Sequence, residues 1–552
     1  MSSSASTRAV DHHRSDYPDK IDAAVLKVAG VVVLGAIMSI LDITVTNVAL
    51  PTFQTAFAQG GEPLAYSTVA WTVTGYTLAL ATVIPLSGWA ADRFGTKRLY
   101  MIALVLFTLG SALCATAGSI EQLIAYRVVQ GLGGGLLMPI GMTIMTRAAG
   151  PARMGRLMAI LGIPMLLGPI FGPILGGWLI DNASWHWIFL INLPIGAAAL
   201  AYAAWALPTD SNHPADRLDI VGLLLMSPGL ALFLYGISSI PGEGTFFSTK
   251  VGVPATIGVL MLAAFVFWSF RPSNPLLDLR LFRNRDFTVA TVTMFLFAGA
   301  FFGGLLLVPT YFQQVRGEDT FHAGLLVAPQ GLGAMITMPI AGALADRFPV
   351  GRIVPVGLAV ITAAFFAFTQ IDAHTSYSYL MTVLFVMGLG MGATMMPLMT
   401  SAIKKLTSHE VARGNTLLNI VQQIASSIGT AIISVLQTNG FKDHAIIGQA
   451  QAFGEASGAA KTPAAMQQLL ARFPEVATVL APHQGDQAGG QAALLAAVRD
   501  AMASAFSHTY WIAAFMVAAT LIPAFFLPRH HEESHLLDDV DGDETRAPVL
   551  MH

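Results

Sequence analysis

Long apolar stretches recur along almost the whole chain and are separated by short polar segments. A membrane-spanning helix needs about 20 consecutive, mostly apolar residues, and on this criterion the sequence predicts fourteen spans. They cover residues 28–52, 66–91, 99–118, 122–145, 156–180, 186–207, 220–240, 251–270, 287–312, 324–345, 353–371, 378–399, 416–436 and 507–527. We therefore expect an all-α polytopic membrane protein.

Lysine and arginine gather in alternate loops between these stretches. The loops on one side hold sixteen of them, whereas the short loops on the other side hold only Lys250 and Arg316. Positively charged loops stay on the cytoplasmic side of a membrane. With an even number of spans, both termini are predicted to be cytoplasmic and the chain to be a multi-pass protein of the plasma (inner) membrane.

Three short motifs occur twice, once in each half of the chain. Their copies are GWAADRF at Gly88–Phe94 and GALADRF at Gly342–Phe348, GLGGGLLMP at 131–139 and GLGMGATMMP at 388–397, and ALPTF at 49–53 and LVPTYF at 307–312. Two parallel six-helix halves are thus predicted, and the spans 220–240 and 251–270 have no counterpart and form an inserted pair. Secondary transporters are built in this way, with one cavity at the midplane between two halves.

The repeat also divides the chain. The predicted parts are a tail (1–27), a first bundle (28–207), a two-helix linker (208–286), a second bundle (287–528) that includes an extracellular loop (437–506), and a tail (529–552).

Composition supports the membrane interpretation and excludes several other classes. Hydrophobic residues make up 54% of the chain and charged residues 11%, against about 25% charged in a soluble domain. A net charge of −3 gives no reason to expect a nucleic-acid partner, and a single cysteine, Cys114, rules out an intrachain disulfide and a thiolate metal cage. The sequence lacks a G-x-x-x-x-G-K-[ST] loop, so we expect neither an ATP-driven pump nor an enzyme, and no metal or cofactor.

One carboxylate, Asp42, lies within the first apolar stretch. A charge at bilayer depth is costly, so it marks a functional site with a partner. At 1.5 Å per residue, Asp42 lies roughly 15 Å and Arg127 roughly 9 Å below the outer ends of their helices, which is close enough for an ion pair. We hypothesise that Asp42 carries a proton and that Arg127 keeps it ionised, with a purely structural buried pair as the alternative.

Several motifs, taken in their order along the chain, resemble those of the major facilitator superfamily, and specifically its fourteen-helix drug:proton antiporters of the EmrB/QacA type. They are Leu41–Pro51, Gly88–Arg98, the set Leu123, Arg127, Gln130 and Gly131, the set Gly168, Gly172, Pro173, Gly176 and Gly177, and Trp185–Gly196. The resemblance implies the major facilitator fold and export of drugs by alternating access, driven by the proton gradient.

The repeated loop motif is predicted to form a gate from the residues Asp92, Arg93, Asp346 and Arg347. By the pattern of the resembled family, Asp92 faces the helix that starts near Asn415. The internal repeat then predicts that Asp346 faces the start of helix five near Gly155. These contacts would close the cytoplasmic side, whereas the alternative is a solvated acidic residue in a basic loop. Because Pro349 and Val350 replace Gly95 and Thr96, the second copy is expected to latch less well.

Glycines recur every fourth residue in the fifth span, at Gly168, Gly172 and Gly176. This spacing puts them on one helix face, where a neighbouring backbone can approach closely. In the resembled family this stripe, together with Pro173 and Gly177, marks antiporters, and tight helix packing is the simpler interpretation.

The six spans of the second half carry no charge within the predicted boundaries and are rich in phenylalanine, methionine and amides. Methionines adapt to variable shapes and aromatic rings attract cations, so the predicted substrates are lipophilic and cationic. The cavity residues expected are Asn47, Gln130, Phe301, Met338, Asn419, Gln422 and Gln423. The leading function is proton-coupled multidrug efflux, and the alternative is export of an endogenous amphiphile such as a lipid or siderophore.

The one long loop, from Gln437 to Ser507, has amphipathic runs at 464–480 and 491–505. They predict a helical hairpin whose second arm continues into the last span. It would cap the exit, dock a periplasmic adaptor protein as in EmrB-type pumps, or be an inert insertion.

Overall fold

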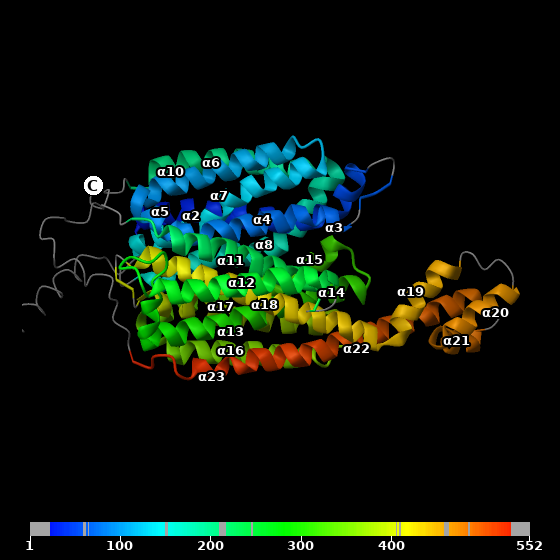
Figure 1. The fold of residues 1–552 in the computed structure, drawn as a ribbon. Helices are drawn as coiled ribbons and strands as arrows, with labels where there is room; N and C mark the ends of the chain where they lie inside the picture. The colour runs from blue at the N-terminus through cyan, green and yellow to red at the C-terminus, as the bar shows by residue number, and fades with distance from the viewer. Residues whose placement is uncertain are drawn as a thin grey trace, which may run out of the picture.

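The computed structural model describes residues 22–530 except 59–61, 65, 150–152, 209–216, 244–246, 405, 408–409, 458–462 and 484–485. Nearly all of the described chain is helical, and the long helices run side by side as one elongated bundle (Figure 1). Within these residues, thirteen helical segments are long and apolar enough to cross a membrane. The fifth predicted span corresponds to a further helix, α8 (Met154–Asn182), which runs alongside them.

The spans of the N-terminal half are formed by α2 (Ala23–Ala56), α4 (Trp71–Val83) continued by η1 (Ile84–Leu86) and α5 (Ser87–Phe94), α6 (Thr96–Ala115), α7 (Ile120–Ala149), α8, and α9 (Trp187–Leu190) continued by α10 (Asn192–Ala206). A short helix, α3 (Tyr66–Val69), precedes α4. Helix α2 begins where the Asp22 carboxylate accepts a hydrogen bond from the Val25 amide at 2.8 Å, which satisfies a free donor of the first turn. This hydrogen bond holds the pKa of Asp22 below its usual value.

The C-terminal half repeats this pattern with α13 (Arg285–Leu305) continued by α14 (Leu307–Gln314), α15 (Thr320–Arg347), α16 (Val350–Phe368), α17 (Tyr377–Lys404), α18 (Val411–Asp443), and α22 (Gln487–Ala519) continued by α23 (Leu521–Ala524). Helix α15 packs closely on α17, and α13 packs on α18. A 3-10 turn, η2 (Leu279–Arg283), leads into α13.

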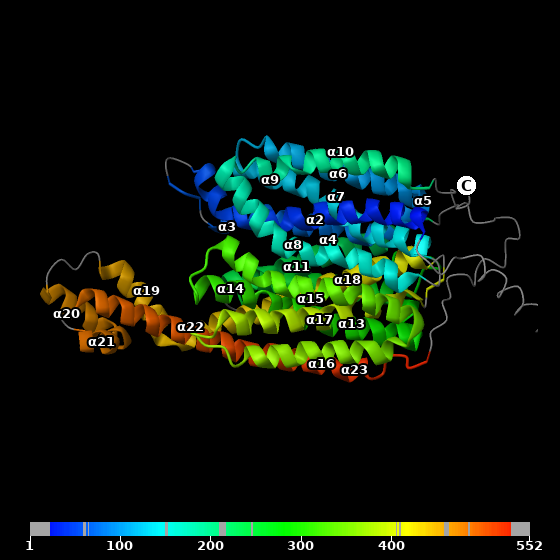
Figure 2. The ribbon, with the colours of Figure 1, turned by 180° about the vertical axis from the view of Figure 1, so that it is seen from behind.

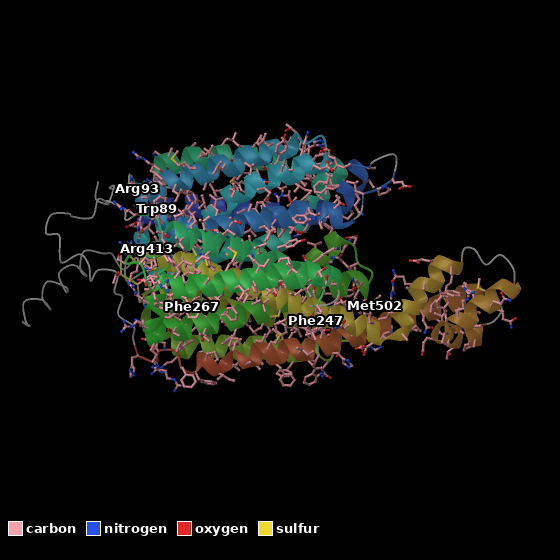
Figure 3. All side chains as sticks on the ribbon, viewed as in Figure 1. Trp89, Arg93, Phe247, Phe267, Arg413 and Met502 are labelled. Carbon is pink, nitrogen blue, oxygen red and sulfur yellow. The ribbon has the colours of Figure 1, made fainter. Side chains whose placement is uncertain are left out.

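The two halves meet along two seams. On one side α8 packs against α15, and on the other α18 packs against α5 and α7. Figure 2 shows α8 and α15 from behind. We call the end of the bundle that carries Arg93, Arg147, Arg347 and Arg413 the basic end; Figure 3 labels Arg93 and Arg413 there.

The inserted pair consists of α11 (Ile220–Glu243) and α12 (Thr249–Ser269). Helix α11 contacts α4 of one half and α18 of the other, and Trp71 stacks on Tyr235 at 5.5 Å between ring centroids. Asp219 fixes the start of α11, since its carboxylate accepts hydrogen bonds from the Gly222 amide at 2.8 Å and from the Trp268 indole at 2.9 Å. Helix α11 therefore contacts both halves, and α12 packs on α11.

A group of short helices projects beyond the end opposite the basic end (Figures 1 and 2). It contains α19 (Ala445–Ser457), α20 (Pro463–Arg472), α21 (Pro474–Leu480) and the first turns of α22, with η3 (Ala481–His483) between them. The predicted helical arms are confirmed, and the second does continue into the last span. The first arm breaks before Pro474, because a proline disfavours helical geometry in the residue before it, and α19 was not predicted.

The glycine stripe of α8 faces α2. A Cβ atom at Gly172 would overlap the side chain of Thr44, and one at Gly168 would overlap Ile40, whereas Gly177 has no neighbouring atom within 4 Å. The side chain of Pro173 lies outside the described residues. The stripe thus holds α8 against the segment of α2 that carries Asp42.

We predict that Gly172→Ala lowers stability and that Gly177→Ala does not. Alanine gains about 1 kcal/mol of helix propensity, but overpacking a tight contact costs about 1–3 kcal/mol, so the overlap with Thr44 dominates at Gly172. The measurement is the thermal unfolding midpoint of the purified variants in detergent. Equal midpoints for the two variants would contradict the tight α2–α8 contact.

Candidate functional site

Asp42 lies in the middle of α2 and is enclosed by side chains of its own half. One carboxylate oxygen, Oδ2, accepts a hydrogen bond from Arg127 Nη1 at 2.5 Å. The other, Oδ1, accepts from Gln130 Nε2 at 2.7 Å and from Asn192 Nδ2 at 3.2 Å. The side chains of Asp42 and Arg127 are 0% exposed, so this is a fully buried ion pair.

The helical periodicity of α7 brings two of these donors together. Arg127 and Gln130 are three residues apart and therefore lie on one face of the helix. Arg127 Nη1 also donates to Gln130 Oε1 at 2.8 Å, and its Nε donates to the Thr72 carbonyl at 3.1 Å. The guanidinium lies over the ring of Tyr76, 4.2 Å from its centroid. These contacts fix the position of the arginine independently of Asp42.

Asn192 and Ser111 complete the cluster, and both were missed in the sequence. Asn192 Nδ2 donates to the Ser111 hydroxyl at 3.1 Å as well as to Asp42, and Gln130 Nε2 lies 3.3 Å from the same hydroxyl. A signal for Asn192 was present, since it is the one polar side chain in the run 187–196. We call Asp42, Arg127, Gln130, Asn192 and Ser111 the carboxylate cluster.

The cluster holds two opposite charges, on Asp42 and on Arg127. The charge of the Asp42 carboxylate is balanced by Arg127, whose second terminal nitrogen, Nη2, is buried without a hydrogen-bond partner among the described residues. A proton on Asp42 would remove that balance and leave a charged arginine in a dry site, which is costly unless the surroundings rearrange.

The acidic residues of the repeated motif lie at the basic end, at the two seams. Asp346 accepts hydrogen bonds from the Gly155 amide at 2.8 Å and from Arg156 Nε at 3.2 Å. Helix α8 begins at Met154, so this carboxylate faces the positive end of a helix dipole. Asp346 joins α15 of one half to α8 of the other.

Asp92 makes ion pairs with two arginines at the second seam. It lies 3.3 Å from Arg147 Nη2 and 4.0 Å from Arg413 Nε, and Arg413 is in the first turn of α18. The Asp92 side chain is 24% exposed and that of Asp346 only 4%. The start of α8 therefore covers the Asp346 carboxylate more fully than the second seam covers Asp92. The weaker latch expected from Pro349 and Val350 stays a prediction.

The two arginines predicted for the gate are on the surface. Arg93 and Arg347 are both exposed, and the ion pairs described above join the neighbouring acidic residues to Arg147, Arg413 and Arg156.

Polar contacts continue the second seam towards the membrane interior. Asn415 Nδ2 lies 3.4 Å from the Thr143 hydroxyl, and Ser87 and Thr416 share a hydrogen bond at 2.9 Å. On the first seam, a Cβ atom at Gly155 or Gly342 would overlap the carbonyl oxygen of the other glycine. At both seams the described contacts between the halves gather at the basic end, which is closed in this structure.

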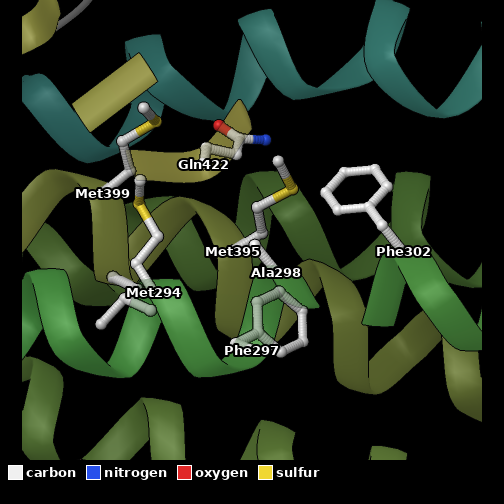
Figure 4. Close-up of a pocket in the computed structure, with 8 residues that line it drawn as sticks. Met294, Phe297, Ala298, Phe302, Met395, Met399 and Gln422 are labelled. Carbon is white, nitrogen blue, oxygen red and sulfur yellow. The ribbon is translucent and has the colours of Figure 1, made fainter. Parts of the chain in front are cut away.

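An apolar pocket lies within the C-terminal half, between α13, α17 and α18 (Figure 4). It is small, with room for about one water molecule, and it is lined by Met294, Phe297, Ala298, Phe302, Met395, Leu398, Met399 and Gln422. Only Gln422 contributes a polar side chain.

The structure separates the cavity residues predicted from the sequence. Gln422 lines the pocket, whereas Phe301 and Met338 are buried in helix packing and Gln130 belongs to the carboxylate cluster. The remaining three lie outside the pocket lining. Asn419 donates to the sulfur of Met142 across the seam at 3.3 Å, Gln423 is half-buried, and Asn47 is exposed.

Known proteins resemble this chain over nearly its whole length. The sequence profile described as Major Facilitator Superfamily matches residues 32–430. The chain is 46% identical to the multidrug resistance protein B homolog of Mycobacterium tuberculosis over 97% of its own length and 94% of that protein. It is 31% identical to the multidrug export protein EmrB of Haemophilus influenzae, over 74% of this chain and 79% of that protein.

Solved structures show the same fold. The human organic anion transporter MFSD10 aligns with a TM-score of 0.56 at 15% identity, over 89% of this chain and 99% of that one. The proton:xylose symporter XylE aligns with a TM-score of 0.56 at 14% identity, over 94% and 99%.

Proposed function

Because the chain belongs to the major facilitator superfamily and its relatives are multidrug transporters, we propose that it is a proton-coupled antiporter that exports lipophilic compounds by alternating access. The observation that carries the proposal is the buried Asp42–Arg127 ion pair. A proton-coupled transporter needs a group that can gain and lose a proton inside the membrane. An intramembrane carboxylate paired with a cationic side chain is such a group.

In this mechanism the charge state of Asp42 sets the packing of the N-terminal half. The ionised carboxylate holds Arg127, Gln130 and Asn192 together, and these residues tie α2, α7 and α10 to one another. Protonation would release the arginine and loosen the same three helices. One carboxylate of this kind fits one proton for each transport cycle.

The seams provide the alternating access. Asp346 of α15 contacts α8, and Asn415 of α18 contacts α7, so that the basic end is closed. This closure corresponds to an outward-facing state if that end is cytoplasmic, as its positive charge suggests. In that orientation the protein lies in the inner membrane, both termini are cytoplasmic, and α19–α21 face outside, where an adaptor protein could reach them.

The test uses purified protein in liposomes with an acidic interior and a pH-sensitive dye inside. Ethidium is added outside, and an antiporter should exchange it for internal protons. The interior pH should then rise only in vesicles that contain protein and only after ethidium is added. No rise with any of a set of lipophilic drugs would refute drug:proton antiport and favour export of an endogenous amphiphile.

A further inference from the structure

The guanidinium of Arg127 has partners other than the carboxylate of Asp42. Its Nε donates to the Thr72 carbonyl at 3.1 Å, and its central carbon lies 4.2 Å from the centroid of the Tyr76 ring. The ring of Phe189 lies farther away, at 5.7 Å. Within the part of the chain that the structure describes, Nη2 of the arginine has no hydrogen-bond acceptor. The face of the Tyr76 ring is therefore a close partner of this cation that carries no charge.

The packing of α4 on α7 fixes the Tyr76 ring in this place. Thr72 and Tyr76 are four residues apart and so lie on one face of α4, where both contact Arg127. A Cβ atom at Gly131 of α7 would overlap the Tyr76 carbonyl oxygen, and one at Gly134 would overlap the Tyr76 hydroxyl. These two glycines let α4 approach α7 closely, and the Tyr76 side chain is completely buried. The same short segment of α7 thus supplies the arginine and the space for the ring beside it.

The contribution of the ring depends on the charge of Asp42. If Asp42 binds a proton, as the proposed mechanism requires, Arg127 loses its counter-charge, and an unpaired cation in a dry site is strongly unfavourable. The negative face of an aromatic ring attracts a cation whether or not the carboxylate is ionised, so the Tyr76 ring remains as a partner. The other titratable group described at the cluster is the thiol of Cys114, which donates to Gln130 Oε1 at 3.5 Å. A thiol that donates its proton in a hydrogen bond is uncharged and cannot replace the carboxylate.

We propose that Tyr76 is a positioning residue for proton coupling, whose ring holds Arg127 while Asp42 is protonated. The inference rests on the proposed antiport function and adds to it a residue that acts through Arg127. An antiporter alternates between a half-cycle in which substrate crosses and a half-cycle in which the proton crosses. The ring should be needed in the proton half-cycle, in which Asp42 is neutral, and not in the substrate half-cycle, in which Arg127 keeps its counter-charge.

The test measures two modes of transport in liposomes that contain the purified protein. Proton-driven exchange, with an acidic interior and ethidium outside, requires both half-cycles. Ethidium self-exchange, with equal pH on both sides, unlabelled ethidium inside and radiolabelled ethidium outside, requires only the substrate half-cycle. Tyr76→Leu should lower the initial rate of proton-driven exchange about tenfold. The same variant should change the rate of self-exchange by less than about twofold.

Two further replacements of Tyr76 separate the ring face from the hydroxyl and from packing. Tyr76→Phe removes only the hydroxyl, which lies 3.3 Å from the Ser39 hydroxyl, and proton-driven exchange should stay within about twofold of the parent rate. Trifluorophenylalanine at the same position keeps the shape of phenylalanine but has a less negative ring face, so it should attract Arg127 less and behave as Tyr76→Leu does. Because this analogue preserves the packing, it decides the question if Tyr76→Leu does not fold.

Tyr100→Leu is the matched control. Tyr100 is also a completely buried tyrosine of the N-terminal half, and its hydroxyl donates to the Val31 carbonyl at 3.2 Å. Among the described residues, the rings over Arg127 are those of Tyr76 and Phe189, so this control removes a buried ring without removing a partner of the arginine. Loss of packing alone should lower both modes of transport to the same extent.

The inference is overturned if Tyr76→Leu and the trifluorophenylalanine variant both exchange protons at the parent rate, or if they slow self-exchange as much as proton-driven exchange. Failure of the proposed function gives a different result. The parent protein itself would then show no proton-driven exchange with ethidium or any other lipophilic drug, whereas normal exchange in both the parent and Tyr76→Leu would refute only the role of the ring.

Discussion

Asp42→Asn is expected to abolish proton-driven export, lowering the initial rate of ethidium exchange in acid-loaded liposomes by at least about 100-fold, as is common when a group essential to a proton-transfer step is removed. Asparagine has the same shape and can still accept hydrogen bonds from Gln130 and Asn192. The asparagine amide cannot bind or release a proton at the pH values of the assay. The expected loss therefore comes from proton exchange and not from a change of size.

The same substitution also leaves Arg127 without its counter-charge. Removing one partner of a buried ion pair costs about 3–5 kcal/mol, a large fraction of the stability of a typical protein. Asp42→Asn should consequently unfold at a lower temperature than the parent. A transport defect in this variant alone could therefore reflect poor folding.

The double variant Asp42→Asn/Arg127→Gln separates the two effects. Because it removes both charges, most of the lost stability should return, as a double-mutant cycle would quantify. Proton-driven exchange should stay absent. Glu121→Gln, at the exposed start of α7, serves as a control and should keep the parent rate. Proton-driven exchange at the parent rate in the double variant would show that the coupling group lies elsewhere.

The apolar pattern of the sequence was enough to predict the spans, because each must satisfy its backbone hydrogen bonds within the membrane and so must be helical. Counting residues from the outer ends of their helices also predicted similar depths for Asp42 and Arg127 in the membrane. The structure places the two side chains in contact. The helices overrun the predicted ends: α18 continues to Asp443 and α22 starts at Gln487. Beyond the membrane, helix continuation depends on local propensity and not on hydropathy.

The pocket residues could not be predicted in the same way. A span that is apolar all round gives no periodic signal for the face it turns inward. Phe301 and Phe302 are adjacent and chemically identical, yet Phe301 is buried in helix packing and Phe302 lines the pocket. Only the packing of α13 against α17 and α18 decides between them.

Asn192 was missed for a related reason, since a neutral amide in an apolar run does not show which carboxylate it will contact.

The second large effect is expected at the α8–α15 seam. Gly155 and Gly342 face one another so closely that a Cβ atom on either would overlap the carbonyl oxygen of the other. Gly342→Ala should therefore push the two helices apart at the basic end. Overpacking of this kind costs about 1–3 kcal/mol, and because that cost falls only on the state in which the seam is closed, the population of the open state should rise about tenfold.

The opening can be measured on the opposite seam, so that local loosening around Gly342 is not mistaken for movement of the halves. Thr146 is buried on α7 beside Asn415, and Thr146→Cys in a Cys114→Ala background provides one reactive thiol there. Maleimide labelling of this thiol should be about tenfold faster when Gly342→Ala is added, matching the predicted shift in population. Gly177→Ala, on the same helix as Gly155 but with open space around it, should leave the rate unchanged. If Gly342→Ala also left it unchanged, the two seams would not open together, and the closed basic end would not depend on the contact between these glycines.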